Sequence, residues 1–201
     1  MTWEGRPYRP RHPLHARRRG VAAVPADRRG EGLIPTLGLG KNLTLAMLGR
    51  LALGGVLIPG KPRELAHALC RTFEIVPPKL SQPILAFSGG NQQKALLARE
   101  LATRPRLLIL NDPTRGIDVK TREAVHRRVE QLADEGLTIV LVTSDTQELL
   151  RLADRVLVLR DGVIVRELDP ATTDEHQMIA VMAAVDYTLA ASPDPTTTTP
   201  G

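Results

Sequence analysis

Residues 107–118 read Leu107-Leu-Ile-Leu-Asn-Asp-Pro-Thr-Arg-Gly-Ile-Asp118, an apolar run that ends in a polar pair and a proline-led turn. The four apolar residues predict a buried strand, because short runs of this kind fill parallel sheets. Asn111 and Asp112 follow directly, and open α/β sheets present ligand-binding groups at the carboxyl ends of their strands. The stretch therefore predicts a parallel sheet whose ligand edge carries Asn111 and Asp112, with Asp118 beyond the turn.

The chain after this turn predicts a helix and a second strand. Val125 and Val129 begin an apolar stripe at helical spacing. Asp118 is placed to cap the amino end of that helix, and Gly136 is placed to end it. Residues 137–143 are dense in Ile and Val, which favours a strand. The unit is strand, helix, strand.

A β-hairpin is expected after the sheet. A short helix around residues 147–153 precedes two apolar runs, 156–159 and 163–165. Asp161 and Gly162 join these runs, and a tight hairpin turn favours such a pair because both positions take positive φ. The fold class is therefore α/β, with a mostly parallel sheet and a terminal β-hairpin.

Helices are expected before residue 105. Residues 92–102 place apolar side chains at helical spacing and are closed by Pro105, and residues 63–73 form a shorter helix. At the other end of the chain, the tail from Ser192 is rich in Thr and Pro. It has nothing to bury and is expected to be disordered.

Residues 87–94 read Phe87-Ser-Gly-Gly-Asn-Gln-Gln-Lys94, a serine and a double glycine that open directly into a helix. Two glycines let backbone amides approach an oxyanion closely, and the serine hydroxyl adds a donor. The helix start contributes unpaired N–H groups and the positive end of its dipole. An isolated Ser-Gly-Gly is more often a turn with an ordinary helix cap, but the following strand and polar pair favour an anion site.

Together these two segments resemble the signature loop, Walker B strand and D-loop of the ATP-binding cassette (ABC) family. The fuller runs Ser-Gly-Gly-Asn-Gln-Gln-Lys and Asp-Pro-Thr-Arg-Gly-Ile-Asp are similar to the second cassette of ribose- and xylose-type importer ATPases. The resemblance extends from about Gly5 to Met182 and includes Val24-Pro-Ala-Asp-Arg28 and Ala153-Asp-Arg-Val-Leu-Val. It implies a partial P-loop NTPase domain with a helical signature region.

The resemblance also implies a division of the chain. Residues 1–30 are a basic lead-in with a remnant of the catalytic core, and 31–104 are a helical subdomain with the signature motif. Residues 105–184 are the α/β core with Walker B, the D-loop and the switch region, and 185–201 are a disordered tail.

Site residues follow from the resemblance as well. In this family, the signature loop of one cassette closes over the γ-phosphate of ATP held by a second cassette. Ser144 stands where most cassettes have a switch histidine, and serine is usual there in this subfamily. The implied set is Ser88, Gly89, Gly90, Asn91, Gln92 and Asp118 for ATP, Asn111 for Mg²⁺, and Asp112 and Ser144 for catalysis.

The Walker B pair departs from the family pattern. The family has an aspartate that supports Mg²⁺ and then a glutamate that polarises the attacking water, whereas this chain has Asn111 and Asp112. Asn111 brings no negative charge to the metal. Asp112 is one methylene shorter than glutamate, and a misplaced base can cost about a hundredfold in rate.

The phosphate-binding loop G-x-x-x-x-G-K-[ST] does not occur in this sequence. Gly40 and Lys41 form a Gly-Lys pair, but Pro35 and Asn42 stand where the motif needs Gly and Ser or Thr, so Gly38–Asn42 is expected to be the start of a helix. The resemblance places the missing loop upstream of Met1, together with a central strand. Such a loss is expected to leave an exposed sheet edge.

The composition of the chain favours no other class of function. The 201 residues, of which 42% are apolar, carry a formal charge of +5. Arginines crowd the first thirty positions, but between Arg6 and Arg29, Tyr8 is the only aromatic residue suited to stacking on bases, so no nucleic acid is expected as a partner. Cys70 is the single cysteine, and the five histidines show no metal-binding spacing. No run approaches the ~20 apolar residues that cross a bilayer.

The expected function is the ATP-binding subunit, or a truncated remnant, of an ABC-type carbohydrate importer that couples ATP binding and hydrolysis to transport. ATP and Mg²⁺ are shared with a second cassette, and further partners are transmembrane permease subunits and, indirectly, a solute-binding protein. The expected location is cytoplasmic and peripheral, at the inner face of the cell membrane. Two alternatives remain open: a non-catalytic partner that supplies its signature face in trans, and a gene fragment.

Overall fold

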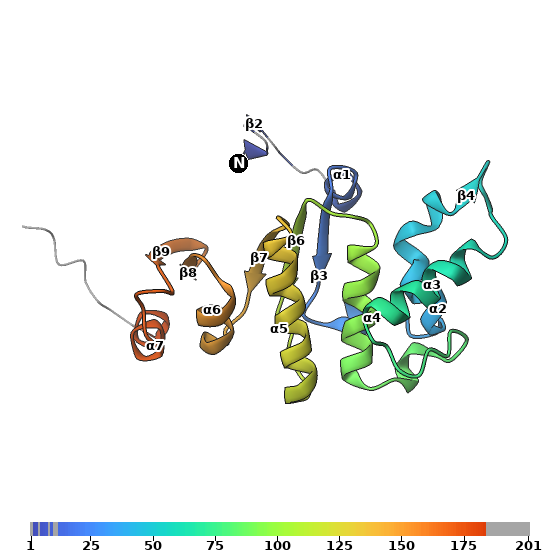
Figure 1. The fold of residues 1–201 in the computed structure, drawn as a ribbon. Helices are drawn as coiled ribbons and strands as arrows, with labels where there is room; N and C mark the ends of the chain where they lie inside the picture. The colour runs from blue at the N-terminus through green and yellow to red at the C-terminus, as the bar shows by residue number, and fades with distance from the viewer. Residues whose placement is uncertain (1, 4, 8, 10–11, 184–201) are drawn as a thin grey trace, which may run out of the picture. The chain divides into compact units, whose positions relative to one another are not determined.

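A three-stranded parallel sheet forms the centre of the first part of the chain (Figure 1). Its order is β3 (Val21–Val24), β6 (Leu107–Asn111) and β7 (Thr138–Val142). This computed structural model describes residues 2–3, 5–7, 9 and 12–183. Strands β6 and β7 confirm the two strands predicted from the sequence. Strand β3 was not predicted, because its Val-Ala-Ala-Val sequence has little β propensity of its own and pairs with β6 along its whole length.

Two helices contribute to the core on one face of this sheet. Leu108 and Leu110 of β6 are fully buried, whereas the side chains of alternate residues point to the other face. Helix α4 (Gly89–Leu101) contacts β3, and helix α5 (Val119–Asp134) buries Val125, Val129 and Leu132. The predicted helix N-cap at Asp118 and the positive φ at Gly136, +90°, are both present.

Before α4, the chain forms a mainly helical region. Its elements are α2 (Leu39–Thr44), the 3₁₀ helix η2 (Leu45–Arg50), a short hairpin of β4 (Ala52–Leu53) and β5 (Val56–Leu57), α3 (Lys61–Thr72) and the 3₁₀ turn η3 (Ile84–Ala86). Helix α2 contacts both α3 and α4. Asn42 is buried in α2, where its side chain bonds the backbone of Ile34, Leu37 and Gly38.

The Gly-Lys pair near residue 40 lies at the start of α2, as predicted. A Cβ on Gly38 would stand 2.8 Å from the carbonyl oxygen of Leu80, and one on Gly40 would stand 3.1 Å from the Leu80 Cβ. The Gly40 N–H donates to the same Leu80 oxygen at 2.9 Å. These glycines therefore permit close packing of two chain segments.

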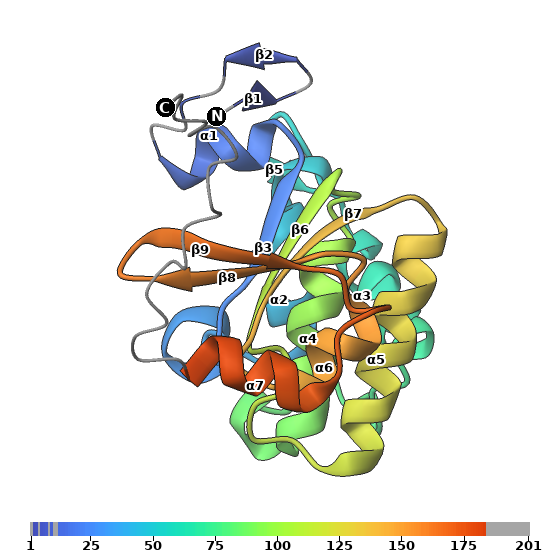
Figure 2. The same cartoon turned by 90° about the vertical axis from the view of Figure 1, so that its left-hand side faces the viewer.

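Four further short elements lie in the described residues up to Gly32, besides β3. These are the short pair β1 (Thr2–Trp3) and β2 (Arg6–Pro7), the helix α1 (Pro13–Arg18), and a single π-helical turn η1 (Arg28–Gly32). Figure 2 shows α1 at one end of β3, which it contacts.

The described residues from Thr146 to Ala183 belong to a separate compact unit. It contains α6 (Thr146–Leu152), the antiparallel pair β8 (Val156–Arg160) and β9 (Val163–Leu168), and α7 (Glu175–Ala183). Asp161 and Gly162 have φ values of +49° and +78°, so the predicted hairpin turn is confirmed. The expected disordered tail, 185–201, lies outside the described residues.

Candidate functional site

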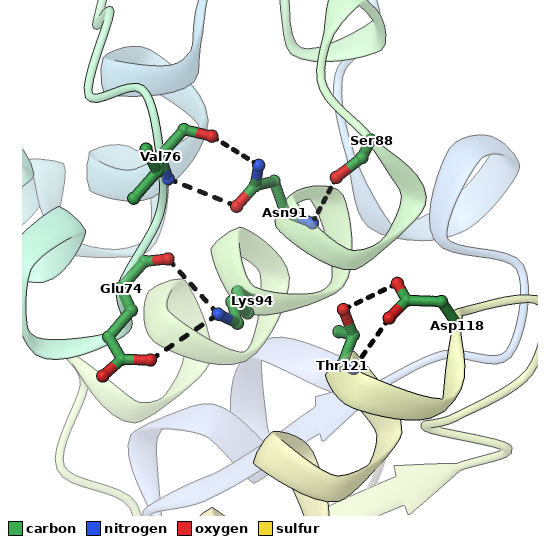
Figure 3. A network of polar contacts seen from close by, with 7 residues as sticks. All are labelled: Glu74, Val76, Ser88, Asn91, Lys94, Asp118 and Thr121. Atoms are coloured by element: carbon green, nitrogen blue, oxygen red, sulfur yellow. Dashed lines mark hydrogen bonds and ion pairs between the residues drawn. The ribbon is translucent and has the colours of Figure 1, made fainter.

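The serine and double glycine singled out from the sequence form the amino end of α4. Ser88 is the N-cap residue, and its Oγ accepts a hydrogen bond of 3.3 Å from the Asn91 N–H (Figure 3). Ser88 is exposed, and no hydrogen bond within the described residues is made by the backbone N–H groups of Gly89 and Gly90. The helix start therefore has an exposed hydroxyl beside two unpaired N–H groups, which suits an anion.

Both glycines also lie close to neighbouring side chains, and packing constrains Gly90 more than Gly89, because the Arg28 side chain beside Gly89 is flexible at its end. A Cβ on Gly89 would stand 2.8 Å from Nη2 of Arg28, and one on Gly90 would stand 2.6 Å from Oγ1 of Thr121. Real Cβ atoms essentially never come so close to another heavy atom. Helix α4 therefore packs against η1 through Gly89 and against the start of α5 through Gly90.

Arg28 connects the first of these neighbours to the turn after β6. Its Nη1 donates to the carbonyl oxygen of Arg115 at 2.8 Å, and its Nη2 donates to that of Gly116 at 3.2 Å. Burial lowers the pKa of this guanidinium, and the neighbouring Arg29 lowers it further. Arg28 ends the segment Val24-Pro-Ala-Asp-Arg28, but this bridge was not predicted from the sequence, because it joins residues that are 87 and 88 positions apart.

Asp27, next to Arg28, holds the π-helical turn in place. Its carboxylate accepts from the N–H groups of Arg29 at 3.1 Å and Gly30 at 2.9 Å. The hydrogen bond from the Gly30 N–H, and to a lesser extent that from Arg29, lowers the pKa of Asp27. Asp27 is therefore the N-cap of the π-helical turn η1, whose first residue is Arg28.

Asn91 and Lys94 attach α4 to the loop that follows α3. The Asn91 side chain accepts from the Val76 N–H at 3.3 Å and donates to the Val76 oxygen at 2.7 Å (Figure 3). The Lys94 ammonium donates to the backbone oxygen of Glu74 at 3.2 Å and lies 4.0 Å from its carboxylate. Asn91 thus uses its amide within the chain.

Gln92 also faces inward. It is fully buried, its amide nitrogen donates to the Phe87 oxygen at 2.7 Å, and its amide oxygen accepts from Arg29 Nε at 3.2 Å. In this structure its side chain supports the loop before Ser88 and offers no free group to a ligand.

Asp118 caps α5 beside Gly90. Its carboxylate accepts from the Thr121 N–H at 2.9 Å and from the Thr121 hydroxyl at 2.8 Å (Figure 3). The hydrogen bond from the Thr121 N–H, and to a lesser extent that from the Thr121 hydroxyl, lowers the pKa of Asp118. Because Thr121 also lies against Gly90, Asp118 orders the residue on which the signature helix packs.

Asn111, Asp112 and Ser144 lie at the carboxyl edge of the sheet, as predicted. Asn111 pairs with Val142, and the Asp112 N–H donates to the Val142 oxygen at 2.8 Å. Asp112 has a φ of +43°, in the left-handed region that Asp tolerates better than most residues. None of the three side chains makes a hydrogen bond or ion pair within the described part of the chain, and none is joined in this way to Ser88.

Comparison with known proteins identifies this arrangement. The sequence family described as ABC transporter matches residues 1–115, more than half of the chain. The chain belongs to this family. Among solved structures, the ABC fold is matched by the ATP-binding cassette MJ0796 in a post-hydrolysis dimer bound to ADP and Pi. That match has a TM-score of 0.67, a sequence identity of 26%, and covers 78% of this chain and 66% of the cassette.

Curated relatives place the chain within the ABC family. It is 42% identical over 175 residues to the ribose import ATP-binding protein RbsA of Rhodococcus jostii, covering 87% of this chain and 35% of the relative. It is 37% identical over 197 residues to the xylose import ATP-binding protein XylG of Paraburkholderia xenovorans, covering 98% and 37%. The chain therefore resembles ribose- and xylose-type ABC ATPases, and it spans about a third of the length of these relatives.

The oxygen donors at the sheet edge fit part of a magnesium shell. Mg²⁺ is usually bound through one or two carboxylates together with substrate phosphates and water. Asp112 has a carboxylate, Asn111 an amide oxygen and Ser144 a hydroxyl that would be available to such a metal. Within the described residues there is no group of three or more His, Cys, Asp or Glu that could hold a metal. The protein donors thus suit a metal that arrives with phosphate.

Proposed function

We propose that this chain is part of the ATP-binding subunit of an ABC-type carbohydrate importer, which couples ATP binding and hydrolysis to solute transport. The proposal is supported by the family match and by relatives named as ribose and xylose import ATP-binding proteins. The chain covers about a third of the length of those relatives. The role in a complete importer is therefore part of the proposal.

The observation that carries the proposal is the exposed start of α4. Ser88, Gly89 and Gly90 offer a hydroxyl and free N–H groups at the positive end of a thirteen-residue helix. In our proposal they contact the γ-phosphate of ATP held by a second cassette. Asn91 and Gln92 shape the loop from within, and Asp118 positions Thr121 behind Gly90.

The remaining site residues act at the carboxyl edge of the sheet. Asn111 and Asp112 would support Mg²⁺ bound with phosphate, which supplies charge neutralisation during phosphoryl transfer. Asp112 would orient water, and Ser144 would take the place of the switch histidine. Because this sequence has no G-x-x-x-x-G-K-[ST] loop, the isolated chain is expected not to turn over ATP.

The proposed partners are a second ATP-binding cassette, transmembrane permease subunits and, through them, a solute-binding protein. The proposed location is cytoplasmic, peripheral at the inner face of the membrane. No described helix is both long and apolar enough to span a bilayer. We also propose that the chain is divided into four parts. These are a basic lead-in (1–30), a helical subdomain (31–104), an α/β core (105–184) and a tail (185–201).

ATP hydrolysis tests this proposal. A cassette of the same importer type that carries a phosphate-binding loop is assayed alone, with this chain, and with the Ser88→Arg variant. We expect the wild-type chain to raise turnover and Ser88→Arg to remove the increase, whereas Ser81→Arg, an exposed serine elsewhere, keeps it. Turnover by the isolated chain at ordinary cassette rates, lost in Asp112→Asn, would overturn the assignment of roles.

A further inference from the structure

A pocket of about 570 Å³ lies at the amino ends of β3 and β6 and is rich in arginine. No acidic side chain is among its lining residues, and its remaining walls are small, apolar or threonine. The arginines come from three separate segments. They are Arg17, Arg18 and Arg19 around the end of α1, Arg50 at the end of η2, and Arg104 and Arg106 before β6. We call this the arginine pocket.

The backbone builds the pocket through Gly20. This glycine has a φ of +84°, and its carbonyl oxygen accepts from the N–H groups of Arg106 at 2.7 Å and Leu107 at 3.1 Å. A Cβ at Gly20 would stand 3.1 Å from Arg106 Cγ. The end of α1 is thereby joined to the start of β6, which brings the two arginine segments together.

Within the chain, these charges are only partly balanced. Arg17 pairs with the buried Glu100 at 3.2 Å, but Glu100 also accepts from Arg99 at 2.9 Å. Arg50 donates to the Thr103 oxygen at 3.5 Å. Arg18 and Arg104 are exposed and make no side-chain hydrogen bond or ion pair with any described residue.

Helix ends account for only part of this charge. Arginines near the carboxyl ends of α1, η2 and α4 offset the helix dipoles, and each helix end carries about half a negative charge. Glu100 adds one more. Arg19 and Arg106 each have a further interaction within the chain, whereas Arg18 and Arg104 leave two exposed guanidinium groups at a cavity that no acidic side chain lines.

We propose that the arginine pocket binds a multivalent phosphate anion, either free or displayed by lipid headgroups. Guanidinium groups pair with phosphate oxygens through two parallel hydrogen bonds. No aromatic side chain lines the pocket, so it lacks the stacking surface that binds nucleic-acid bases.

This site is separate from the candidate ATP site. The arginine pocket adjoins the first residues of β3 and β6, whereas Asn111 and Asp112 follow the last residues of β6. A five-residue strand separates the two ends by roughly 13 Å. A bound anion would join α1, η2 and the segment between α4 and β6, and would stabilise their arrangement.

Titration calorimetry of the full chain with inorganic tripolyphosphate tests the proposal at low and physiological ionic strength. We expect saturable binding that weakens with salt, and a loss of about tenfold for each of Arg18→Gln and Arg104→Gln. Arg127→Gln removes an exposed arginine outside the pocket and should not change the affinity. Ser81→Ala, which changes an exposed serine that does not line the arginine pocket, should not change it either. Circular dichroism checks the fold of each variant.

Flotation with phosphatidylglycerol vesicles separates the two sources of phosphate. Binding to these vesicles that is reduced by Arg18→Gln and Arg104→Gln assigns the anion to lipid, and binding of tripolyphosphate alone assigns it to a free ligand. The proposal is overturned if neither probe binds, or if the two variants bind as the wild type does. The proposal would also be overturned if the chain bound a single-stranded oligonucleotide but bound neither tripolyphosphate nor the vesicles.

Discussion

Gly90 and Thr121 lie so close that a Cβ on Gly90 would come within 2.6 Å of the Thr121 hydroxyl oxygen. This contact joins the amino ends of α4 and α5, and Ser88 and Asp118 are the N-cap residues of these two helices. Asp118 fixes the same threonine through two hydrogen bonds. Gly90, in a double glycine that suits a phosphate, is therefore also a packing requirement.

Gly90→Ala should destabilise the chain by about 1–3 kcal/mol, because the added methyl must displace Thr121 or tilt α4. Urea unfolding measures this change. Gly49→Ala is the matched control, since a Cβ there meets nothing within 4 Å. The cost of Gly90→Ala should fall in a Thr121→Ala background. An equal cost in both backgrounds would contradict the close approach.

Asp118→Ala should lower the thermal unfolding midpoint at neutral pH, because α5 loses its cap. The folded-state pKa of Asp118 is lowered, so its contribution is present above the ordinary carboxyl pKa and is lost as pH falls through the folded value. The difference from wild type should thus shrink as the pH falls below about 4. Asp134→Ala, at the other end of α5, should cause no loss at any pH. A difference for Asp118→Ala that does not shrink as the solution is made more acidic would contradict the carboxylate cap.

Asn91→Ala should release the loop after α3, because Val76 loses both of its hydrogen bonds to the Asn91 side chain. Hydrogen exchange at the Val76 amide should accelerate, with a loss of stability of about 1–2 kcal/mol. Gln131→Ala, on an exposed face of α5, provides the control. Unchanged exchange at Val76 would show that the loop is held by other contacts.

Asp112→Val should destabilise the chain by about 1–3 kcal/mol, because a β-branched residue is strained at a φ of +43°. Asp112→Gly should be tolerated, since glycine adopts this backbone without strain. Chemical denaturation of both variants checks the prediction. Equal stability of the two would mean that the turn after β6 relaxes in solution.

The elements with strong local patterns were predictable from the sequence. Strands β6 and β7 follow from their apolar runs, α5 from its cap and stripe, and the β8–β9 turn from Asp161-Gly162. Strand β3 was not predictable in this way, because two of its four residues are alanine and its pairing with β6 is long-range.

The site was predictable to a similar extent. Motif spacing indicated Ser88 and the Asn111–Asp112 pair. The bridge from Arg28 to Arg115 and Gly116, and the inward orientation of Gln92, depend on contacts between distant segments. No local pattern reports such contacts.

ATP-dependent association tests the central claim most directly. This chain is mixed with a cassette that carries a phosphate-binding loop and is blocked in hydrolysis, and sedimentation velocity is recorded with and without Mg-ATP. We predict a complex that forms only with Mg-ATP, persists in Ser81→Arg and is lost in Ser88→Arg. Association that is independent of ATP, or that survives Ser88→Arg, would contradict the claim that this chain closes a nucleotide site with its signature helix.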